Sequence, residues 1–329
     1  MLRLGKLDND DLDRLVLKKF RRVRPESLSS PTIGQDCAML DLGGDLVALS
    51  CDPITSASIA HLGRLTVHVS CNDAAAAGAE PVGLLVTLLM PQTGTMEQIS
   101  RIADDLSAAA RLANVDILGG HTEVTDAVTR AVTSATVVAR QPRDRALRGM
   151  RPDDEIVMTK WVAVEGTTIL AEDFPDRLSG VPGELIESAH ALSGFLSIVP
   201  ESRIAMRHGA CAMHDVTEGG VLGAAWELGF ANACAVEIDT DRIPVRKDTR
   251  ALCAALSLDP LRLIGSGSLL IAVKDGGALV SALEKEGIPA ACIGRAIEGK
   301  TSFADGAPLD EPHADELYRL YGRDEQHDV

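Results

Sequence analysis

Three aspartates have the residue type and the local setting of a magnesium–nucleotide site. Asp36, Asp52 and Asp73 each follow or end a short apolar, strand-like run and are flanked by small residues. Magnesium bound to a nucleotide takes carboxylates together with phosphate oxygens, and small neighbours let a triphosphate approach the backbone. The spacing alone also fits a plainer interpretation, in which Asp36 and Asp52 lie in turns and Asp73 caps the start of an Ala-rich helix.

A second segment, residues 119–123, reads Gly-Gly-His-Thr-Glu and directly follows an expected strand over residues 116–118. Glycines at a strand end free backbone amides for phosphate, and Thr122 adds a hydroxyl donor. His121 can contact phosphate or act as an acid–base group near neutral pH, although a histidine beside a glycine turn also fits a structural role. The segment matches neither the dinucleotide fingerprint nor the Walker motif, and an ordinary turn is the alternative.

A third segment, residues 213–220, reads Met-His-Asp-Val-Thr-Glu-Gly-Gly and precedes a helical pattern that runs to residue 228. A helix that starts at this point offers free amides and a partial positive charge to an anion. A plain capped turn explains the same residues equally well on local grounds.

Taken in order, these segments resemble the PurM-like superfamily, which includes aminoimidazole ribonucleotide (AIR) synthetase, thiamine-monophosphate kinase, selenophosphate synthetase and the hydrogenase-maturation protein HypE. The resemblance runs from Gly5 to about Ile297, and HypE is the nearest branch. The stretch from Asn72 to Pro81 is its most specific part. The segments that carry the resemblance are Gly34-Gln35-Asp36-Cys37-Ala38, Cys51-Asp52-Pro53, Asn72-Asp73-Ala74-Ala75-Ala76-Ala77-Gly78-Ala79-Glu80-Pro81, Gly119-Gly120-His121-Thr122-Glu123, Asp215-Val216-Thr217-Glu218-Gly219-Gly220, Gly265-Ser266-Gly267-Ser268-Leu269-Leu270 and Ile293-Gly294-Arg295-Ala296.

The resemblance implies a two-domain α/β (α+β) protomer whose N-terminal sheet pairs with that of a second copy in a homodimer. It implies ATP and Mg²⁺ as cofactors, with Asp36, Asp52 and Asp73 as metal ligands. His121 and Glu218 are the catalytic candidates. The other residues expected at the nucleotide are Asn72, Gly119, Gly120, Thr122, Asp215, Gly219 and Gly220.

Three departures from the family pattern limit this transfer of roles. Gln35 stands where the family usually has an acidic residue, which removes a metal ligand. His121 stands in place of an Asp or Glu, so it is not counted among the metal ligands. Glu218 replaces the Arg of the HypE motif, so a substrate contact there has changed sign.

The resemblance also bears on the reaction. HypE dehydrates a modified cysteine at its own C-terminus, whereas the last cysteine of this sequence is Cys292, in an expected strand. We therefore expect an ATP-dependent enzyme that phosphorylates a carbonyl or amide oxygen of a separate small molecule or peptide. Two alternatives remain: a small-molecule kinase like thiamine-monophosphate kinase, and a non-catalytic nucleotide-binding partner in metallocentre (hydrogenase) maturation.

Composition limits the class of protein. The 329 residues carry a formal net charge of −16, which argues against nucleic-acid binding because phosphate neutralisation needs clustered Lys and Arg. The seven cysteines lack a Cys-x-x-Cys pair, which is typical of reduced thiols; Cys37, Cys51 and Cys71 are expected to be small buried residues. Neither a secretory signal nor a membrane-length apolar run is visible, so a cytoplasmic protein without membrane contact is expected.

The elements that must hold these residues follow from hydrophobic periodicity. Helices are expected over residues 8–20, capped by Asp8 or Asn9, and over residues 96–113. A division at a segment dense in Arg, Asp, Pro and Gly, residues 140–154, gives two domains, 1–147 and 148–329. Residues 322–329 are expected to fray. Strands are expected over residues 46–50, 82–90, 116–118, 131–139, 155–159, 235–238, 268–273 and 291–297.

Overall fold

A computed structural model describes residues 7–55, 57–312 and 314–321. The chain forms two compact units. The N-terminal unit contains residues 22–30 and 36–146, and the C-terminal unit contains residues up to 21, residues 31–35 and residues from 147 onward. The domain limits expected from the sequence, 1–147 and 148–329, stay a prediction. The tail that was expected to fray, residues 322–329, lies outside the described residues.

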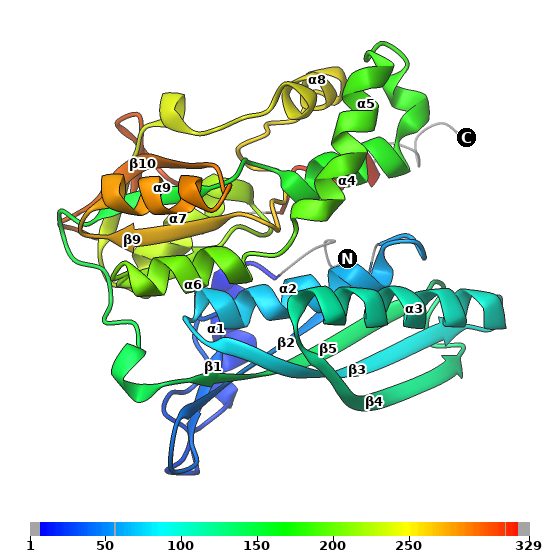
Figure 1. Cartoon of the computed structure of the whole chain (residues 1–329), viewed down its shortest axis with the longest axis horizontal. Coiled ribbons are helices and arrows are strands. Elements are labelled where there is room, and N and C mark those ends of the chain that lie inside the picture. Colours follow the sequence, from blue (N-terminus) through cyan, green and yellow to red (C-terminus); the bar gives the residue numbers. More distant parts are fainter. Residues whose placement is uncertain (1–6, 56, 313, 322–329) are drawn as a thin grey trace. The chain divides into compact units, whose positions relative to one another are not determined.

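The N-terminal unit is a five-stranded sheet with two helices on one face (Figure 1). The strand order is β1-β2-β5-β3-β4, and only the pairing of β3 with β4 is parallel. Because a parallel pair needs a crossover, the helix α3 connects β3 to β4. The elements are β1 (Ala38–Asp41), β2 (Leu46–Ile54), α2 (Leu62–Ala76), β3 (Glu80–Pro91), α3 (Met96–Ala113), β4 (Asp116–Thr125), β5 (Val132–Gln141) and a 3-10 turn at Arg143–Arg145.

The helix α2 is held against the sheet by close contacts. The hydroxyls of Thr66 and Thr133 form a buried hydrogen bond of 2.6 Å between α2 and β5. Gly63 allows α3 to approach, since a Cβ at this position would lie 2.5 Å from the backbone nitrogen of Leu106. Alternate residues of β5 are buried, as expected for a strand with one covered face. These contacts fix the helix that carries Asn72 and Asp73.

Two sequence-based expectations in this unit are wrong. Asp73 does not start an Ala-rich helix: it lies in the last turn of α2, which begins at Leu62. The strand expected over residues 116–118 continues to Thr125, so residues 119–123 lie inside β4 and do not form a turn after it. Gly120 has a φ of +146°, and a Cβ there would lie 1.8 Å from the carbonyl oxygen of Val86. Close approach of two strands, not a turn, therefore requires this glycine.

The C-terminal unit contains a seven-stranded sheet in the order β12-β11-β8-β10-β6-β9-β7. Its strands are β6 (Glu155–Thr159), β7 (Ala212–Asp215), β8 (Ala235–Ile238), β9 (Leu269–Val273), β10 (Ala290–Ile297), β11 (Phe303–Ala304) and β12 (Ala307–Pro308). Its α-helices are α1 (Asn9–Leu15), α4 (Val164–Asp173), α5 (Gly183–His190), α6 (Val199–Arg207), α7 (Gly220–Ala231), α8 (Lys247–Leu256), α9 (Gly276–Lys285) and α10 (Tyr318–Tyr321). Short 3-10 turns lie at Leu17–Lys19, Pro175–Leu178, Ala191–Phe195 and Thr240–Arg242.

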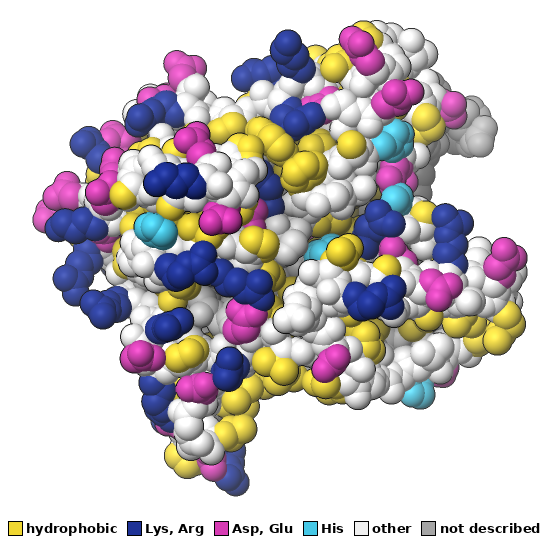
Figure 2. Space-filling view, viewed as in Figure 1, with side chains coloured by type: hydrophobic (Ala, Val, Ile, Leu, Met, Phe, Trp, Pro, Cys, Tyr) yellow, Lys and Arg dark blue, Asp and Glu magenta, His cyan; other side chains and the backbone are white. Residues whose placement is uncertain are grey.

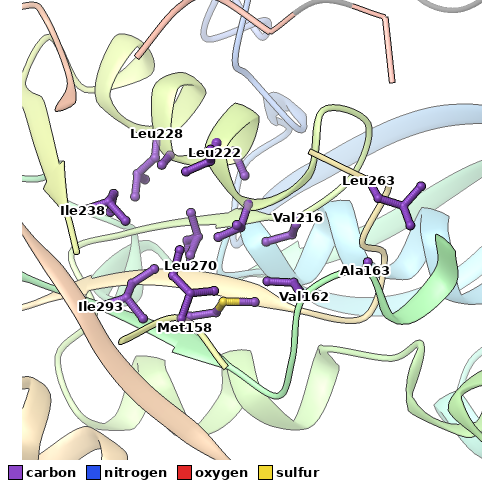
Figure 3. Packing of buried hydrophobic residues seen from close by; sticks show 14 of the residues in the cluster. Met158, Val162, Ala163, Val216, Leu222, Leu228, Ile238, Leu263, Leu270 and Ile293 are labelled. Atoms are coloured by element: carbon purple, nitrogen blue, oxygen red, sulfur yellow. The ribbon is translucent and has the colours of Figure 1, made fainter. Parts of the chain in front are cut away.

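A buried core joins this sheet to α7. Figure 3 shows Leu222 and Leu228 of α7 pointing toward side chains of the strands, with Met158 and Leu270 opposite them. Val162, Val216 and Leu263 belong to the same buried cluster and extend it toward the start of α4 (Figure 3). The packing fixes the β7–α7 connection, which carries the segment Asp215–Gly220.

The surface and the helix lengths add two observations. On the face shown in Figure 2, Lys and Arg side chains are interspersed with Asp and Glu. Among the residues that the structure describes, no helix combines the length and the apolar composition needed to span a membrane.

Cys37 and Cys71 are buried as expected, but Cys51 is exposed, so its interpretation as a buried residue is wrong.

Candidate functional site

In the N-terminal unit, the structure brings two of the three predicted metal ligands together. Asp52 lies on β2 and Asp73 lies in the last turn of α2, 21 positions later. The hydroxyl of Ser50 lies 3.1 Å from Oδ2 of Asp52 and forms a short hydrogen bond with Oδ2 of Asp73. Neither carboxylate is fully buried. The two carboxylates therefore share one hydroxyl group between β2 and the last turn of α2.

This pair fits a magnesium ion. The Ser50 hydroxyl has a single proton, so it can donate to only one of the two carboxylates at a time. A divalent cation relieves the repulsion of two neighbouring carboxylates, and oxygen donors are those that Mg²⁺ prefers. Asp36, the third predicted ligand, is partly buried and lies two residues before β1.

The residues beside Asp73 are fixed by packing. Asn72 and Cys71 are completely buried. Burial raises the pKa of the Cys71 thiol to about 12, with a further contribution from the charge of Asp73. A thiol that stays protonated at neutral pH is not a nucleophile, so the chemistry of this end of α2 is that of its carboxylate.

The segment predicted to bind phosphate through Gly119, Gly120 and Thr122 forms part of an exposed edge strand. Every residue of β4 from Asp116 to Val124 is exposed. The Nε2 atom of His121 lies 3.4 Å from Oε2 of Glu123, and both side chains are largely in contact with solvent. The proposed roles of these residues stay predictions.

In the C-terminal unit, the segment Asp215–Gly220 precedes the helix α7, as expected from the sequence, and follows the strand β7, which was not predicted. Asp215 and its neighbour His214 are buried, and Nδ1 of His214 lies 2.8 Å from the carbonyl oxygen of Asp215. Gly219 is left-handed, with a φ of +83°. A Cβ on Gly220 would lie 2.4 Å from the carbonyl oxygen of Leu261, so this connection requires glycine.

The start of α7 is covered by the chain after residue 311. The backbone N–H of Gly219 donates to Oδ2 of Asp315 at 2.8 Å, so an aspartate already caps the amide that the sequence assigned to phosphate. The Tyr318 hydroxyl donates to Oε1 of Glu218 at 2.7 Å. The acidic residue at position 218, where the HypE motif has Arg, therefore anchors the last described helix.

The structure adds Glu165 to this cluster, which sequence reasoning missed. Glu165 is the second residue of α4 and is only 8% exposed. Burial is the main reason that its pKa rises to about 7, and the negative charges of Asp315, Glu218 and Asp215 raise it further. Burial likewise raises the pKa of Asp315 to about 6. A signal existed in the sequence, since Glu165 is the only charged residue between Trp161 and Leu170.

Comparison with known families identifies the class of protein. Residues 34–140 match the N-terminal domain and residues 151–306 match the C-terminal domain of AIR synthase related proteins. Together the two matches cover most of the chain. The protein therefore belongs to the AIR synthase related, PurM-like family, and its fold is the two-domain α/β fold of that family.

The relatives place the chain on the HypE side of this family. The carbamoyl dehydratase HypE of Escherichia coli is 27% identical over 319 residues, which cover 90% of this chain and 93% of HypE. The crystal structure of E. coli HypE superposes with a TM-score of 0.74 at 26% identity, covering 94% of this chain and 99% of that one. A thiamine-monophosphate kinase in complex with AMPPCP and TMP shares the fold, with a TM-score of 0.73 at 18% identity and coverage of 94% and 98%.

Proposed function

We propose that this protein is an ATP- and Mg²⁺-dependent enzyme that phosphorylates a carbonyl or amide oxygen of a separate small molecule or peptide. The observation that carries the proposal is the pairing of Asp52 and Asp73 around Ser50, inside the part of the chain that matches the family's N-terminal domain. The similarity to carbamoyl dehydratases supports activation of an amide-type oxygen. A HypE structure solved with ATP has the same fold at 23% identity.

In this proposal Asp52 and Asp73, joined by Asp36, hold the magnesium ion, which neutralises charge on the phosphates. Phosphoryl transfer depends mainly on positioning and electrostatic stabilisation. Packing of α2 against β5 through Thr66 and Thr133 sets the position of Asp73. The Ser50 hydroxyl fixes the orientation of both carboxylates.

The products distinguish this reaction from the alternatives. The protein is incubated with MgATP and a panel of carboxamides, carboxylic acids and alcohols, and ADP, free phosphate and phosphorylated products are followed by chromatography and phosphorus NMR. An activating dehydratase produces ADP and free phosphate together with a dehydrated product. A stable phosphorylated product instead identifies a small-molecule kinase, as in the fold neighbour that binds TMP. Nucleotide binding without turnover of any compound favours a non-catalytic role in hydrogenase maturation.

We further propose that the protein is a homodimer. The strand β4 is an exposed sheet edge, and exposed edges with apolar side chains are usually covered by a partner. The large exposed apolar residues of β3 and β4 are Val82, Leu85, Ile117, Leu118 and Val124. Among the described strands of this sheet, the exposed large apolar side chains therefore lie on β3 and β4.

Light scattering tests this proposal. Wild-type protein at micromolar concentration should have twice the chain mass of 34.8 kDa. Leu118→Glu places a charge in the proposed interface and should shift the population toward monomer. Leu112→Glu is the matched control, because Leu112 lies on α3 and is 83% exposed; this variant should stay dimeric. A wild-type protein that is monomeric under these conditions refutes the proposal.

A further inference from the structure

The last described segment, residues 314–321, lies over the start of α7 as a strap. Within it, Leu317 and Leu320 are only 6% and 1% exposed, so the strap packs on the C-terminal unit through these apolar side chains. Its helix α10 has only four residues, and a helix this short has little stability of its own. The conformation of the strap therefore depends on its contacts with the unit beneath it.

Two polar contacts attach the strap to the β7–α7 connection. The carboxylate of Asp315 accepts hydrogen bonds from the backbone N–H groups of Gly219 at 2.8 Å and Leu317 at 2.9 Å. The Tyr318 hydroxyl donates to Oε1 of Glu218 at 2.7 Å. Burial raises the pKa of Tyr318, so this donor keeps its proton through the neutral range.

The docked strap brings its own carboxylate into a group of carboxylates. Asp315 is 2% exposed, and Glu165, at the start of α4, is 8% exposed. Three negative charges act on Glu165. They belong to Asp315 in the strap, Glu218 in the β7–α7 connection and Asp215 at the end of β7. Docking therefore places Asp315 where every ionised neighbour in this group repels it.

The cations of the strap region are engaged elsewhere. Arg319 pairs with Glu316 inside the strap at 2.6 Å, and Glu316 also accepts a hydrogen bond from the backbone N–H of Asp259. At the far end, Nη1 of Arg177 lies 3.4 Å from the carbonyl oxygen of Leu320. The largest charge effects on Asp315 and on Glu165 come from carboxylates, not from these arginines.

The two buried carboxyl groups titrate close to neutral pH. Burial is the main cause that raises the pKa of Asp315 to about 6 and that of Glu165 to about 7, and neighbouring negative charge adds to both shifts. In a detached strap Asp315 is in water, where its pKa returns to the usual 3.8, and Glu165 loses one negative neighbour. The docked strap thus holds protons that the detached strap releases, so a rise in pH favours detachment.

We infer that residues 314–321 form a pH-sensitive strap, which repulsion between the ionised carboxylates of Asp315 and Glu165 releases from the start of α7. Release uncovers the backbone N–H of Gly219 and the carboxylate of Glu218, which the docked strap occupies. All of these residues belong to the C-terminal unit, and the device operates without any substrate.

Hydrogen–deuterium exchange of the strap amides measures release. The backbone N–H groups of Tyr318, Arg319 and Leu320 form hydrogen bonds inside the strap, and they exchange when it opens. After correction for the intrinsic pH dependence of exchange, their protection in the wild-type protein should fall about tenfold or more between about pH 5 and about pH 8.

The fully buried strand β9 serves as the internal reference, because its amides report global unfolding. They should stay more protected than the strap amides at both pH values. Two results overturn the inference in wild type: equal protection of the strap at the two pH values, and strap amides that exchange only as slowly as those of β9.

Variants assign the effect to the two carboxylates. Asp315→Asn is neutral throughout and should lose most of the fall in protection. Glu165→Gln keeps every contact of the strap and should show a smaller fall than wild type. Tyr318→Phe lacks only the hydrogen bond to Glu218, so its strap should open about fivefold more at both pH values with unchanged pH dependence.

Glu184→Gln, which changes an exposed carboxylate on α5, should match wild type. If Asp315→Asn leaves the strap unprotected at both pH values, Glu165→Gln decides the matter, since its strap keeps the hydrogen bonds of Asp315 and Tyr318. A fall in protection as large as that of wild type in Asp315→Asn or in Glu165→Gln overturns the inference.

Discussion

Asp73→Asn should abolish most of the thermal stabilisation that magnesium and ATP together give to the wild-type protein. Ligand at about a hundred times its dissociation constant stabilises a fold by roughly 2.7 kcal/mol, which corresponds to a melting shift of several degrees for a chain of this size. Asparagine keeps the size of the side chain and can accept the hydrogen bond from Ser50, so the melting temperature without ligand should change little. Differential scanning fluorimetry with ATP, with magnesium and with both measures the effect.

Two variants make this result specific to the metal site. Asp104→Asn changes an exposed aspartate on the neighbouring helix α3 and should keep the full shift. Asp52→Asn, which alters the other carboxylate at Ser50, should lose the shift as Asp73→Asn does. If Asp73→Asn retains the full shift while wild type responds to both ligands together, Asp73 is a structural residue and Asp52 and Asp36 become the leading ligands.

The bounds of three elements were predictable from the sequence. The helix expected over residues 96–113 has these bounds in the structure. Its start is marked by a capping box between Thr95 and Gln98, and its end by the left-handed Asn114. The strands expected over residues 155–159 and 235–238 also have their predicted bounds. In these segments local propensity, hydrophobic pattern and end signals agree.

The helix α2 was missed because its pattern is not amphipathic. Eleven of its residues are buried, on nearly all sides, and a helix that is buried all round lacks the 3.6-residue alternation that identifies surface helices. Thr66 and Val67 are also β-branched, which weakens the helical signal. The same gap in the prediction placed Asp73 at a helix start. The contact with Ser50 depends on its place in the last turn.

The candidate site was predictable only where its residues are close in sequence. The segment Asp215–Gly220 was visible as a glycine pair before a helix, but its contact with Asp315 joins residues 96 positions apart. No local pattern reports such a contact. From the sequence, Glu218 was interpreted as a catalytic candidate whose substrate contact has changed sign, whereas the structure pairs it with Tyr318.

The free energy of unfolding should fall as the pH rises through the neutral range, and Glu165→Gln should remove much of this fall. The pKa of Glu165 in the folded protein is about 7, against a model value of 4.5. The folded state therefore holds a proton that the unfolded state releases. Its contribution to stability is fully present below the unfolded pKa and is lost as the pH rises through the folded one. At about 1.4 kcal/mol per pH unit, the loss amounts to about 3 kcal/mol.

Denaturant unfolding of wild type and Glu165→Gln at about pH 5 and about pH 8 measures this difference. Glutamine is neutral at both pH values, so the two proteins should have similar stability in acid, while the variant should be more stable by roughly 2–3 kcal/mol in mild alkali. Glu184→Gln should follow the wild-type curve, because Glu184 is exposed on α5 and lies outside the cluster of carboxylates. Asp315, whose pKa is raised to about 6, remains in both proteins. The free energy of unfolding of the variant should therefore still fall with rising pH, by a smaller amount than in wild type. Parallel curves for wild type and Glu165→Gln across this range would show that Glu165 is ionised in the folded protein, and a cation near it would then have to balance the three neighbouring carboxylates.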